Sequence, residues 1–442
     1  MPDVVHERFA EVQTAEEQSA EKRGTRALPR GQMARLLIAV LIFGMTLWRY
    51  YEPYRPHSIC GTGYESLQLA CSLAENGSFS DPFQTLATGP SAHLAPLFPG
   101  YVSLLMRLFG SDTYAGFALA WSTIAIFGVH LALLPFLSRH FGLGFSPGVL
   151  AAAVFLMAKL YPYTMWESFY VALLAIILSF LMYDILRGSA SQGKVILTAT
   201  LWGITLWMAT VPVLIMLAWL GWIFVKTGIP RRQKLILLIL PFLVISPWLI
   251  RNFTVFHHFI FVRDNLGLEL AVSNNPCATF WFKSNEFSRC FEINHPNKGL
   301  DQAERVLQLG EYEYNQARLH EALEWIRGNP RRFAELTGLR IAAFWFPSPT
   351  GHPLSDSQMP PGVLVMWFMT LLSIPGLWLM WRKNANAAGI FALWLALFPL
   401  IYYIIQFDPR YRFPILWVVL LLAGFGIAEL AKGVWHAFQA KS

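Results

Sequence analysis

The sequence predicts an all-α polytopic membrane protein with about ten transmembrane helices. Hydrophobic residues make up 55% of the 442 residues, and charged residues make up only 14%. Long apolar stretches recur along the chain, and each approaches the roughly 20 residues that a helix needs to span a bilayer. Basic residues fall in alternate gaps between these stretches, as expected where basic loops stay on one side of a membrane.

Ten apolar stretches account for the predicted spans. In chain order they cover residues 33–48, 114–137, 149–163, 170–186, 195–209, 211–225, 235–250, 363–380, 390–405 and 415–431. The net charge of +7 is carried by Lys and Arg residues in the gaps between them. Because no polar segment has a basic face interleaved with aromatic residues, this charge does not indicate nucleic-acid binding.

The chain begins with a polar tail, residues 1–32, which becomes basic at Lys22 and Arg23. We expect this tail to be disordered and cytoplasmic. A cleaved secretory signal would place its apolar stretch close to the start and follow it with a small-residue cleavage site. Here the stretch 33–48 begins late and runs into Arg49, so we predict a retained membrane anchor.

The stretch 94–109 decides the orientation of every later element. It has about 16 residues, fewer than a span needs, and it carries Pro96 and Pro99 near its start. We therefore predict an interfacial helix on the outer face. With this assignment every basic gap lies inside, both termini are cytoplasmic, and the protein is a multi-pass component of the plasma (inner) membrane.

The predicted topology divides the chain into four parts. These are the tail 1–32, a transmembrane module 33–250 that includes the first outer loop 49–113, an extracytoplasmic loop 251–361 with amphipathic helices, and C-terminal transmembrane helices 362–442. Polar residues without an obvious solvating role gather in the two outer segments. Function is therefore expected where the outer membrane surface meets water.

The four cysteines all fall in these outer segments. Cys60 and Cys71 lie in the first, and Cys277 and Cys290 lie in the second. Disulfides persist in oxidising compartments, so this placement agrees with the predicted orientation. Four cysteines allow three pairings, of which we favour Cys277 with Cys290 and Cys60 with Cys71. The alternative is that they are free, buried thiols.

A short amphipathic helix is predicted over residues 61–77, with apolar residues at helical spacing and Asn76-Gly77 at its end. Glu65 lies in its first turn, where the helix dipole favours a negative charge. A capping role is one interpretation of Glu65. A catalytic role is the other.

The order of short motifs in this loop resembles that in the first outer loop of the GT-C glycosyltransferases, the branch of protein mannosyltransferases and bacterial aminoarabinose transferases. The motifs are Tyr64-Glu65, residues 72–83, residues 88–93, which end at His93, and residues 96–99. The resemblance implies juxtamembrane helices in this loop, a polyprenyl-phosphate sugar donor, and a catalytic carboxylate on the first helix. On this chain that carboxylate is Glu65. Many relatives carry Asp near the positions of Thr62 and Gly63, and this chain has no acid there.

The same resemblance suggests further site residues. Glu167, between two spans, would bind the acceptor or a metal; its alternative role is helix capping. Candidates for contacts to the lipid phosphate or the substrate are Arg251, the pair Arg263 and Asn265 in an Arg-x-Asn-x-Gly-x-Glu-Leu run, Arg410 and Arg412 before the last span, Lys159 beside the Glu167 loop, and His93. Arginine suits phosphate because it offers paired N–H donors. Ordinary headgroup anchoring is the alternative for Arg410 and Arg412.

No Cys/His metal spacing and no phosphate-cradling glycine loop occurs in the sequence. A divalent cation, Mg²⁺ or Mn²⁺, is the only cofactor that the chemistry suggests, and the metal ligands stay unassigned. The expected partners are a polyprenyl-phosphate-linked sugar, the bilayer, and a glycan, lipid or protein acceptor in the cell envelope, without nucleic acid.

Together, the topology and the resemblance predict a membrane glycosyltransferase with Glu65 as general base and residues 33–250 as its catalytic module. Inversion of the anomeric centre is what the resemblance implies. The main alternative is a secondary transporter or lipid flippase. Such proteins place ionisable residues at mid-membrane in two repeated halves. The predicted spans have few charges at their centres and show no repeat. A membrane scaffold without chemistry is a third interpretation.

Overall fold

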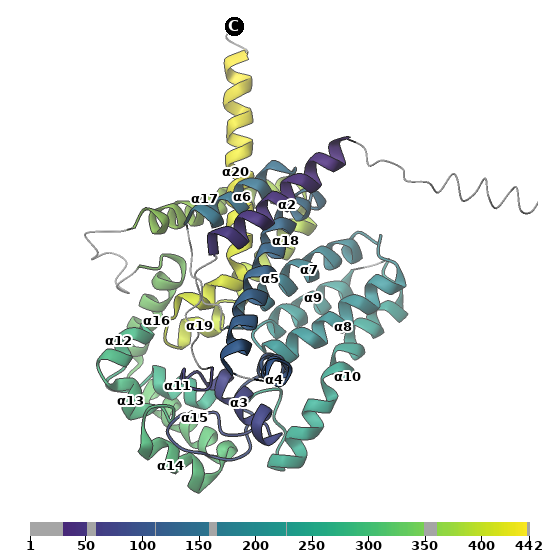
Figure 1. The fold of residues 1–442 in the computed structure, drawn as a ribbon. Helices are drawn as coiled ribbons and strands as arrows, with labels where there is room; N and C mark the ends of the chain where they lie inside the picture. Colours follow the sequence, from purple (N-terminus) through teal and green to yellow (C-terminus); the bar gives the residue numbers. More distant parts are fainter. Residues whose placement is uncertain are drawn as a thin grey trace, which may run out of the picture. The chain divides into compact units, whose positions relative to one another are not determined.

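The computed structural model describes residues 30–50, 59–110, 112–158, 166–226, 228–348 and 360–439. These residues form α-helices and one short 3-10 helix, and their only strand-like features are two isolated bridges, Ser80 with Pro90 and Trp281 with Phe407. The predicted all-α class is confirmed (Figure 1). Residues 1–41 and 42–442 form two separate units, and the described part of the first unit is helical.

The helices follow the predicted apolar and amphipathic stretches. In chain order they are α2 (Arg30–Tyr50), α3 (Glu65–Asn76), α4 (Leu97–Phe109), α5 (Asp112–His140), α6 (Ser146–Ala158), α7 (Ser168–Leu186), α8 (Gln192–Met208), α9 (Val213–Val225), α10 (Arg231–Phe256), α11 (Leu266–Ser273), α12 (Phe282–Phe287), α13 (Cys290–Asn294), α14 (Leu300–Leu309), α15 (Glu311–Gly328), α16 (Pro330–Trp345), α17 (Pro361–Lys383), α18 (Ala385–Leu397), α19 (Leu400–Ile404), the 3-10 helix η1 (Pro409–Arg412) and α20 (Phe413–Gln439).

Seven segments of the described chain are long and apolar enough to cross a membrane: α2, α5, α7, α10, α17, α18 with α19, and η1 with α20. The chain is therefore a multi-pass membrane protein. The remaining three predicted spans are the helices α6, α8 and α9, which have 13, 17 and 13 residues. At 1.5 Å per residue these helices are about 20–26 Å long, shorter than a bilayer core of about 30 Å. The predicted count of ten spans is not confirmed.

Helix α20 lies at the centre of the transmembrane bundle, where it packs against α6, α7 and α17. Every residue from 413 to 426 on α20 is buried. Gly376 on α17 allows the close approach of these two helices, because an added Cβ would lie 2.1 Å from the carbonyl oxygen of Leu422. Small residues at such crossings are typical of membrane helix packing.

The loop between α2 and α5 holds two helices, α3 and α4, which pack against each other. Helix α3 ends at Gly77, which takes the left-handed conformation as predicted. Helix α4 corresponds to the predicted interfacial stretch 94–109. It has 13 residues and buries Phe98 and Val102 against the protein. Leu108 is exposed, so part of the apolar surface of this helix does not contact the rest of the protein.

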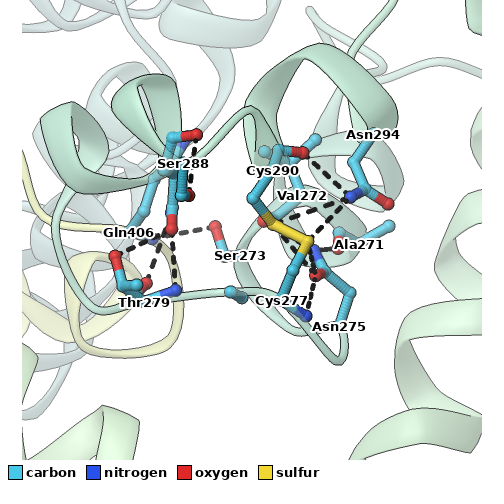
Figure 2. The surroundings of a disulfide bond; sticks show 12 residues. Ala271, Val272, Ser273, Asn275, Cys277, Thr279, Ser288, Cys290, Asn294 and Gln406 are labelled. Atoms are coloured by element: carbon cyan, nitrogen blue, oxygen red, sulfur yellow. Dashed lines mark hydrogen bonds between the residues drawn. A yellow bond between two sulfur atoms is a disulfide. The ribbon is translucent and has the colours of Figure 1, made fainter.

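Both predicted disulfides are present. Cys60 pairs with Cys71 across 11 residues, which ties the segment before α3 to the middle of that helix. Cys277, in the loop after α11, pairs with Cys290, the first residue of α13, across 13 residues (Figure 2). The side chain of Asn275 supports this second bridge, since its Oδ1 accepts a hydrogen bond from the Cys277 backbone N–H at 3.0 Å.

A polar network joins the segment between α11 and α13 to the loop before α20 (Figure 2). Asn285 donates to Gln406 Oε1 at 2.7 Å, and the Gln406 backbone N–H donates to Ser273 Oγ at 2.8 Å. Phe407 forms a parallel bridge with Trp281. The loop that leads into η1 is therefore held against α11 by buried hydrogen bonds.

Candidate functional site

Two cavities meet beside the N-terminal end of α3. The larger has a volume of about 470 Å³ and the smaller about 270 Å³. Much of the larger wall is apolar, and it includes Val171, Val211, Val213, Leu214, Leu266, Leu397, Phe398, Ile401 and Ile405. About half of the smaller wall is polar, and its polar residues include Thr62, Lys283, Glu286, His295, Asn297, Lys298, Gln406 and Asp408. One molecule with an apolar part and a polar part could therefore occupy the larger cavity while a polar molecule enters the smaller one.

Five residues line both cavities and so form the boundary between them: Glu65, Trp166, Glu269, Arg410 and Tyr411. They come from α3, the segment before α7, α11 and η1. Two of them are carboxyl groups and one is a guanidinium. Groups that could move a proton and stabilise an anion thus lie where the contents of the two cavities would meet.

Glu65 is the first residue of α3, and its side chain is 20% exposed, toward the cavities. The backbone carbonyl of the preceding residue, Tyr64, accepts the first bonds of the helix, from Leu67 and Gln68, at 2.9 Å each. The side chain of Gln68 donates to the carbonyl oxygen of Cys60 at 2.7 Å. This local structure, together with the Cys60–Cys71 bridge, fixes the backbone from which Glu65 projects.

The surroundings of Glu65 favour its protonated form. Burial raises the pKa of Glu65 to about 7, and the nearby carboxyl of Glu269 adds to the rise, while Arg410 and Arg263 oppose it. Burial also raises the pKa of Glu269. A carboxyl group that titrates near neutral pH can accept a proton and release it again, which is the property that general acid–base catalysis requires.

Three polar residues at the start of α11 and just before it, Arg263, Asn265 and Glu269, form a second polar cluster in the site. Arg263 Nε donates to Asn265 Oδ1 at 2.7 Å, and Asn265 Nδ2 donates to Glu269 Oε1 at 3.4 Å. All three residues line the larger cavity. Gly267 makes this placement possible, because an added Cβ would lie 2.0 Å from the Asn315 carbonyl oxygen on α15, so only glycine lets the two helices approach this closely.

The direction of Arg263 depends on the residue before it. Val262 is buried and has φ of 65°, a left-handed conformation that β-branched residues rarely adopt. Trp248 Nε1 donates to the Val262 carbonyl oxygen at 2.6 Å, and Asn252 Nδ2 donates to it at 3.4 Å. Two buried donors thus stabilise the backbone turn that leads Arg263 into the cavity.

Arg410 is held by aromatic and acidic neighbours. Its guanidinium carbon lies 3.4 Å from the centroid of the Trp166 ring and 5.1 Å from that of Tyr411. Its Nε lies 3.9 Å from Asp408 Oδ1. Tyr411 in turn stacks on Tyr402 with 4.4 Å between ring centroids. This arrangement fixes the plane of the guanidinium at the junction of the two cavities.

The structure thus brings together five predicted site residues: Glu65, Glu167, Arg263, Asn265 and Arg410 all line the larger cavity. Glu167 is the residue before α7, and its side chain makes no capping hydrogen bond to that helix. Lys159 lies outside the described residues.

Arg251 lies elsewhere and lines neither cavity. Its guanidinium donates to the carbonyl oxygens of Ser91 at 2.7 Å and Phe79 at 3.0 Å, and it packs 4.8 Å from the Trp248 ring centroid. These contacts join the end of α10 to the loop between α3 and α4. Arg251 therefore supports this loop, and its contact with phosphate stays a prediction.

Arg412 and His93 also lie outside the two cavities. Arg412 is 4% exposed and donates to the carbonyl oxygen of Trp345 and to Thr370 Oγ1. His93 is 1% exposed, and within the described residues neither of its ring nitrogens has a hydrogen-bond partner. Burial and the nearby His295 hold the pKa of His93 well below its usual value, so the ring is neutral.

Four residues of the site were not predicted from the sequence: Glu269, Trp166, Tyr411 and His295. Glu269 could have been found, because it stands four residues after Asn265 on a helix, which places the two side chains on one face. The other three come from separate elements. Among the described residues no group of three or more His, Cys, Asp or Glu side chains is placed to hold a metal ion.

A buried carboxyl group on α15, that of Glu311, makes the stability of the fold depend on pH. Glu311, the first residue of α15, is 5% exposed and accepts a hydrogen bond from the Ala92 backbone N–H at 2.5 Å. Burial raises the pKa of Glu311 to about 8. The folded protein therefore holds a proton that the unfolded chain releases above its ordinary carboxyl pKa of about 4.5, so stability falls as pH rises from that value through about 8.

We expect Glu311→Gln to remove most of this dependence, because glutamine keeps the acceptor oxygen and carries no ionisable proton. The variant should lose less stability than the wild type between about pH 6 and about pH 9, by roughly 2–4 kcal/mol. Thermal unfolding in detergent at both pH values checks this. Glu304→Gln, which changes an exposed carboxyl group on the neighbouring helix α14, is the matched control and should leave the dependence unchanged.

No protein-family model matches the chain, and no curated protein matches it in sequence. Among solved structures, ArnT from Cupriavidus metallidurans bound to undecaprenyl phosphate matches with 13% identity and a TM-score of 0.38, over 92% of this chain and 79% of that chain. The same protein in the apo state matches with 14% identity and a TM-score of 0.34, over 91% and 78%. ArnT is a GT-C aminoarabinose transferase, of the family that the sequence motifs resemble.

Proposed function

We propose that this chain is a membrane glycosyltransferase that transfers a sugar from a polyprenyl-phosphate donor to an extracytoplasmic acceptor, with Glu65 as general base. One observation carries the proposal. Two carboxyl groups and a guanidinium stand at the junction of a mainly apolar cavity and a polar cavity, in a protein with several membrane-spanning helices. Such a junction suits a reaction between a lipid-linked donor and a polar acceptor.

The larger cavity suits the donor. Its apolar wall, formed in part by α9 and α18, would hold the first isoprenyl units of the lipid. The phosphate would then lie near Arg263 and Arg410, whose guanidinium groups can stabilise an anion through paired N–H donors. The sugar would extend toward Glu65 and Glu269 at the boundary of the polar cavity.

The smaller cavity suits the acceptor, which would approach past Asn297 and Lys298. Glu65 removes the proton from the acceptor hydroxyl or amine, and the acceptor atom forms a new bond to the anomeric carbon. The bond between that carbon and the phosphate oxygen breaks, and its electron pair leaves with the lipid phosphate, which Arg410 stabilises. Attack from the side opposite the phosphate inverts the anomeric centre.

Purified protein in lipid nanodiscs, supplied with a panel of radiolabelled polyprenyl-phosphate sugars and with envelope glycans, lipids and peptides as acceptors, tests the proposal. We expect release of polyprenyl phosphate from one donor, dependent on one acceptor class. If no donor is consumed and the same protein moves labelled polyprenyl-phosphate sugar across vesicle membranes, the chain is a flippase and the proposal is wrong.

A further inference from the structure

A short segment after α13, residues 295–297, lies directly against the start of α3. Asn297 Nδ2 donates to the Gly63 carbonyl oxygen at 2.6 Å, and Asn297 Oδ1 accepts from the Gln84 backbone N–H at 2.9 Å. Thr85 Oγ1 donates to the Pro296 carbonyl oxygen at 2.5 Å. These bonds bring a part of the chain more than 200 residues away to the backbone that carries Glu65, since the Asn297–Gly63 pair is separated by 234 residues.

His295, at the beginning of this segment, reaches Glu65 itself. Its Nε2 lies 3.4 Å from Glu65 Oε1, and its side chain is 3% exposed. The ring is wedged between aromatic neighbours: it stacks on Phe291 with 4.4 Å between ring centroids and meets Phe83 edge-on at 6.0 Å. Because these contacts leave little room for rotation, the ring presents the same nitrogen to Glu65 throughout.

The protonation of the ring follows from its other hydrogen bond. The Asn297 backbone N–H donates to His295 Nδ1 at 3.1 Å, so Nδ1 must keep its lone pair. Burial, with a smaller contribution from Arg318, lowers the pKa of His295 to about 3, so the ring is neutral at physiological pH. A neutral imidazole whose Nδ1 accepts a hydrogen bond carries its single proton on Nε2. The N–H that faces Glu65 is therefore a donor.

The other charged groups around Glu65 do not replace this donor. Glu269 on α11 and Glu167 before α7 raise the pKa of Glu65, whereas Arg410 on η1 and Arg263 lower it. Within the described residues neither arginine forms a hydrogen bond to Glu65, and the His295 contact of 3.4 Å is longer than the usual hydrogen bond. His295 Nε2 is a neutral donor that faces Oε1 at this distance.

We propose that His295 is a positioning residue for Glu65, which it orients by donating its Nε2–H to Oε1. The contact leaves Oε2 to receive the acceptor's proton, and it stabilises the ionised carboxylate that can act as a base. The catalytic meaning of this contact rests on the proposed glycosyltransferase function. The contact itself has a consequence that can be measured without any substrate, namely the pH at which Glu65 titrates.

Two substitutions separate the two nitrogens of the ring. His295→Asn keeps a group near the Nδ1 position, which can still accept from Asn297, and loses the donor at Nε2. His295→Gln places its amide nitrogen near the Nε2 position and can still donate to Glu65. Thr85→Val is the matched control, because it removes the bond to Pro296 and loosens the same segment without touching Glu65.

The measurement is infrared difference spectroscopy of the purified protein as a function of pH, with the Glu65 carboxyl band identified by its absence in Glu65→Gln. We expect His295→Asn to raise the Glu65 titration midpoint by about one pH unit, since a lost hydrogen bond to the charged form disfavours it. His295→Gln should restore most of the wild-type midpoint, and Thr85→Val should leave it unchanged.

An unchanged midpoint in His295→Asn, or an equal shift in Thr85→Val, would overturn the proposal, because His295 would then act only through the folding of the segment. The activity readout is kept separate. If a transferase activity is found, its pH optimum should move upward in His295→Asn together with the Glu65 midpoint, and an optimum that stays in place would also contradict the proposal. If none is found while the midpoint shifts as expected, the contact stands and the glycosyltransferase function fails.

Discussion

Glu65→Gln is expected to lower the rate of sugar transfer by about 10²–10⁴-fold, the usual contribution of a positioned general base. Glutamine keeps the size of the side chain and can still contact His295, so the site should stay intact while the proton acceptor is lost. The donor should still bind, and the Michaelis constant for the donor should change little. Steady-state kinetics with the donor identified in the nanodisc assay measure both quantities.

The pH dependence of the wild type tests the same residue. With the pKa of Glu65 near 7, the base is protonated at lower pH. The specificity constant should fall about tenfold for each pH unit below about 7 and level off above it. Glu75→Gln is the matched control, since Glu75 is an exposed carboxylate on the same helix. A rate in Glu65→Gln equal to that of this control would remove Glu65 from the mechanism.

Arg410→Gln is expected to reduce the turnover number by about 10²–10³-fold, the usual effect of removing one group that stabilises developing negative charge. The departing lipid phosphate gains charge as the anomeric bond breaks, and Arg410 stands where the two cavities meet. The loss should appear mainly in the turnover number and less in donor binding, because Arg263 also lines the donor cavity.

Arg410→Lys distinguishes charge from shape. Lysine keeps the positive charge but cannot stack as a plane on Trp166, where the guanidinium carbon lies 3.4 Å from the ring centroid. We expect it to recover only part of the lost rate. Arg331→Gln, which changes an exposed arginine on α16, controls for the general loss of a positive charge. Full activity in Arg410→Gln would show that the phosphate lies elsewhere.

The sequence was a good guide to local structure. Apolar stretches predicted the membrane helices, because burial in lipid forces the backbone to satisfy its own hydrogen bonds. The i, i+3, i+4 spacing after Glu65 predicted α3, and Gly77 ended the helix as expected. The placement of all four cysteines in two segments led to the correct disulfide pairs. The lengths of the predicted spans were less reliable, since α6 and α9 are apolar but only 13 residues long.

The sequence predicted a site residue well where nearby residues determine the direction of its side chain. Glu65, Arg263 and Asn265 stand at helix ends or in loops whose direction follows from nearby sequence, and they do reach the cavity. Arg251 looked equally suited to phosphate, because an arginine at the end of a span has the same appearance in sequence whether it faces solvent or a carbonyl oxygen. The loop that supplies its acceptors, Phe79 and Ser91, lies far away in sequence.

The amino-acid sequence by itself determined that this chain forms apolar helices, which segments between them are polar, and that Glu65 lies in the first turn of a short helix. The predicted start of that helix, residue 61, precedes the observed start at Glu65. Only the tertiary structure decided which polar groups share a cavity: that Glu269 faces Glu65, that Arg410 lies on Trp166, and that His295 reaches the carboxylate. Periodicity and hydropathy act over a few residues, whereas these contacts join residues separated by up to several hundred positions, and their formation depends on how the helices pack.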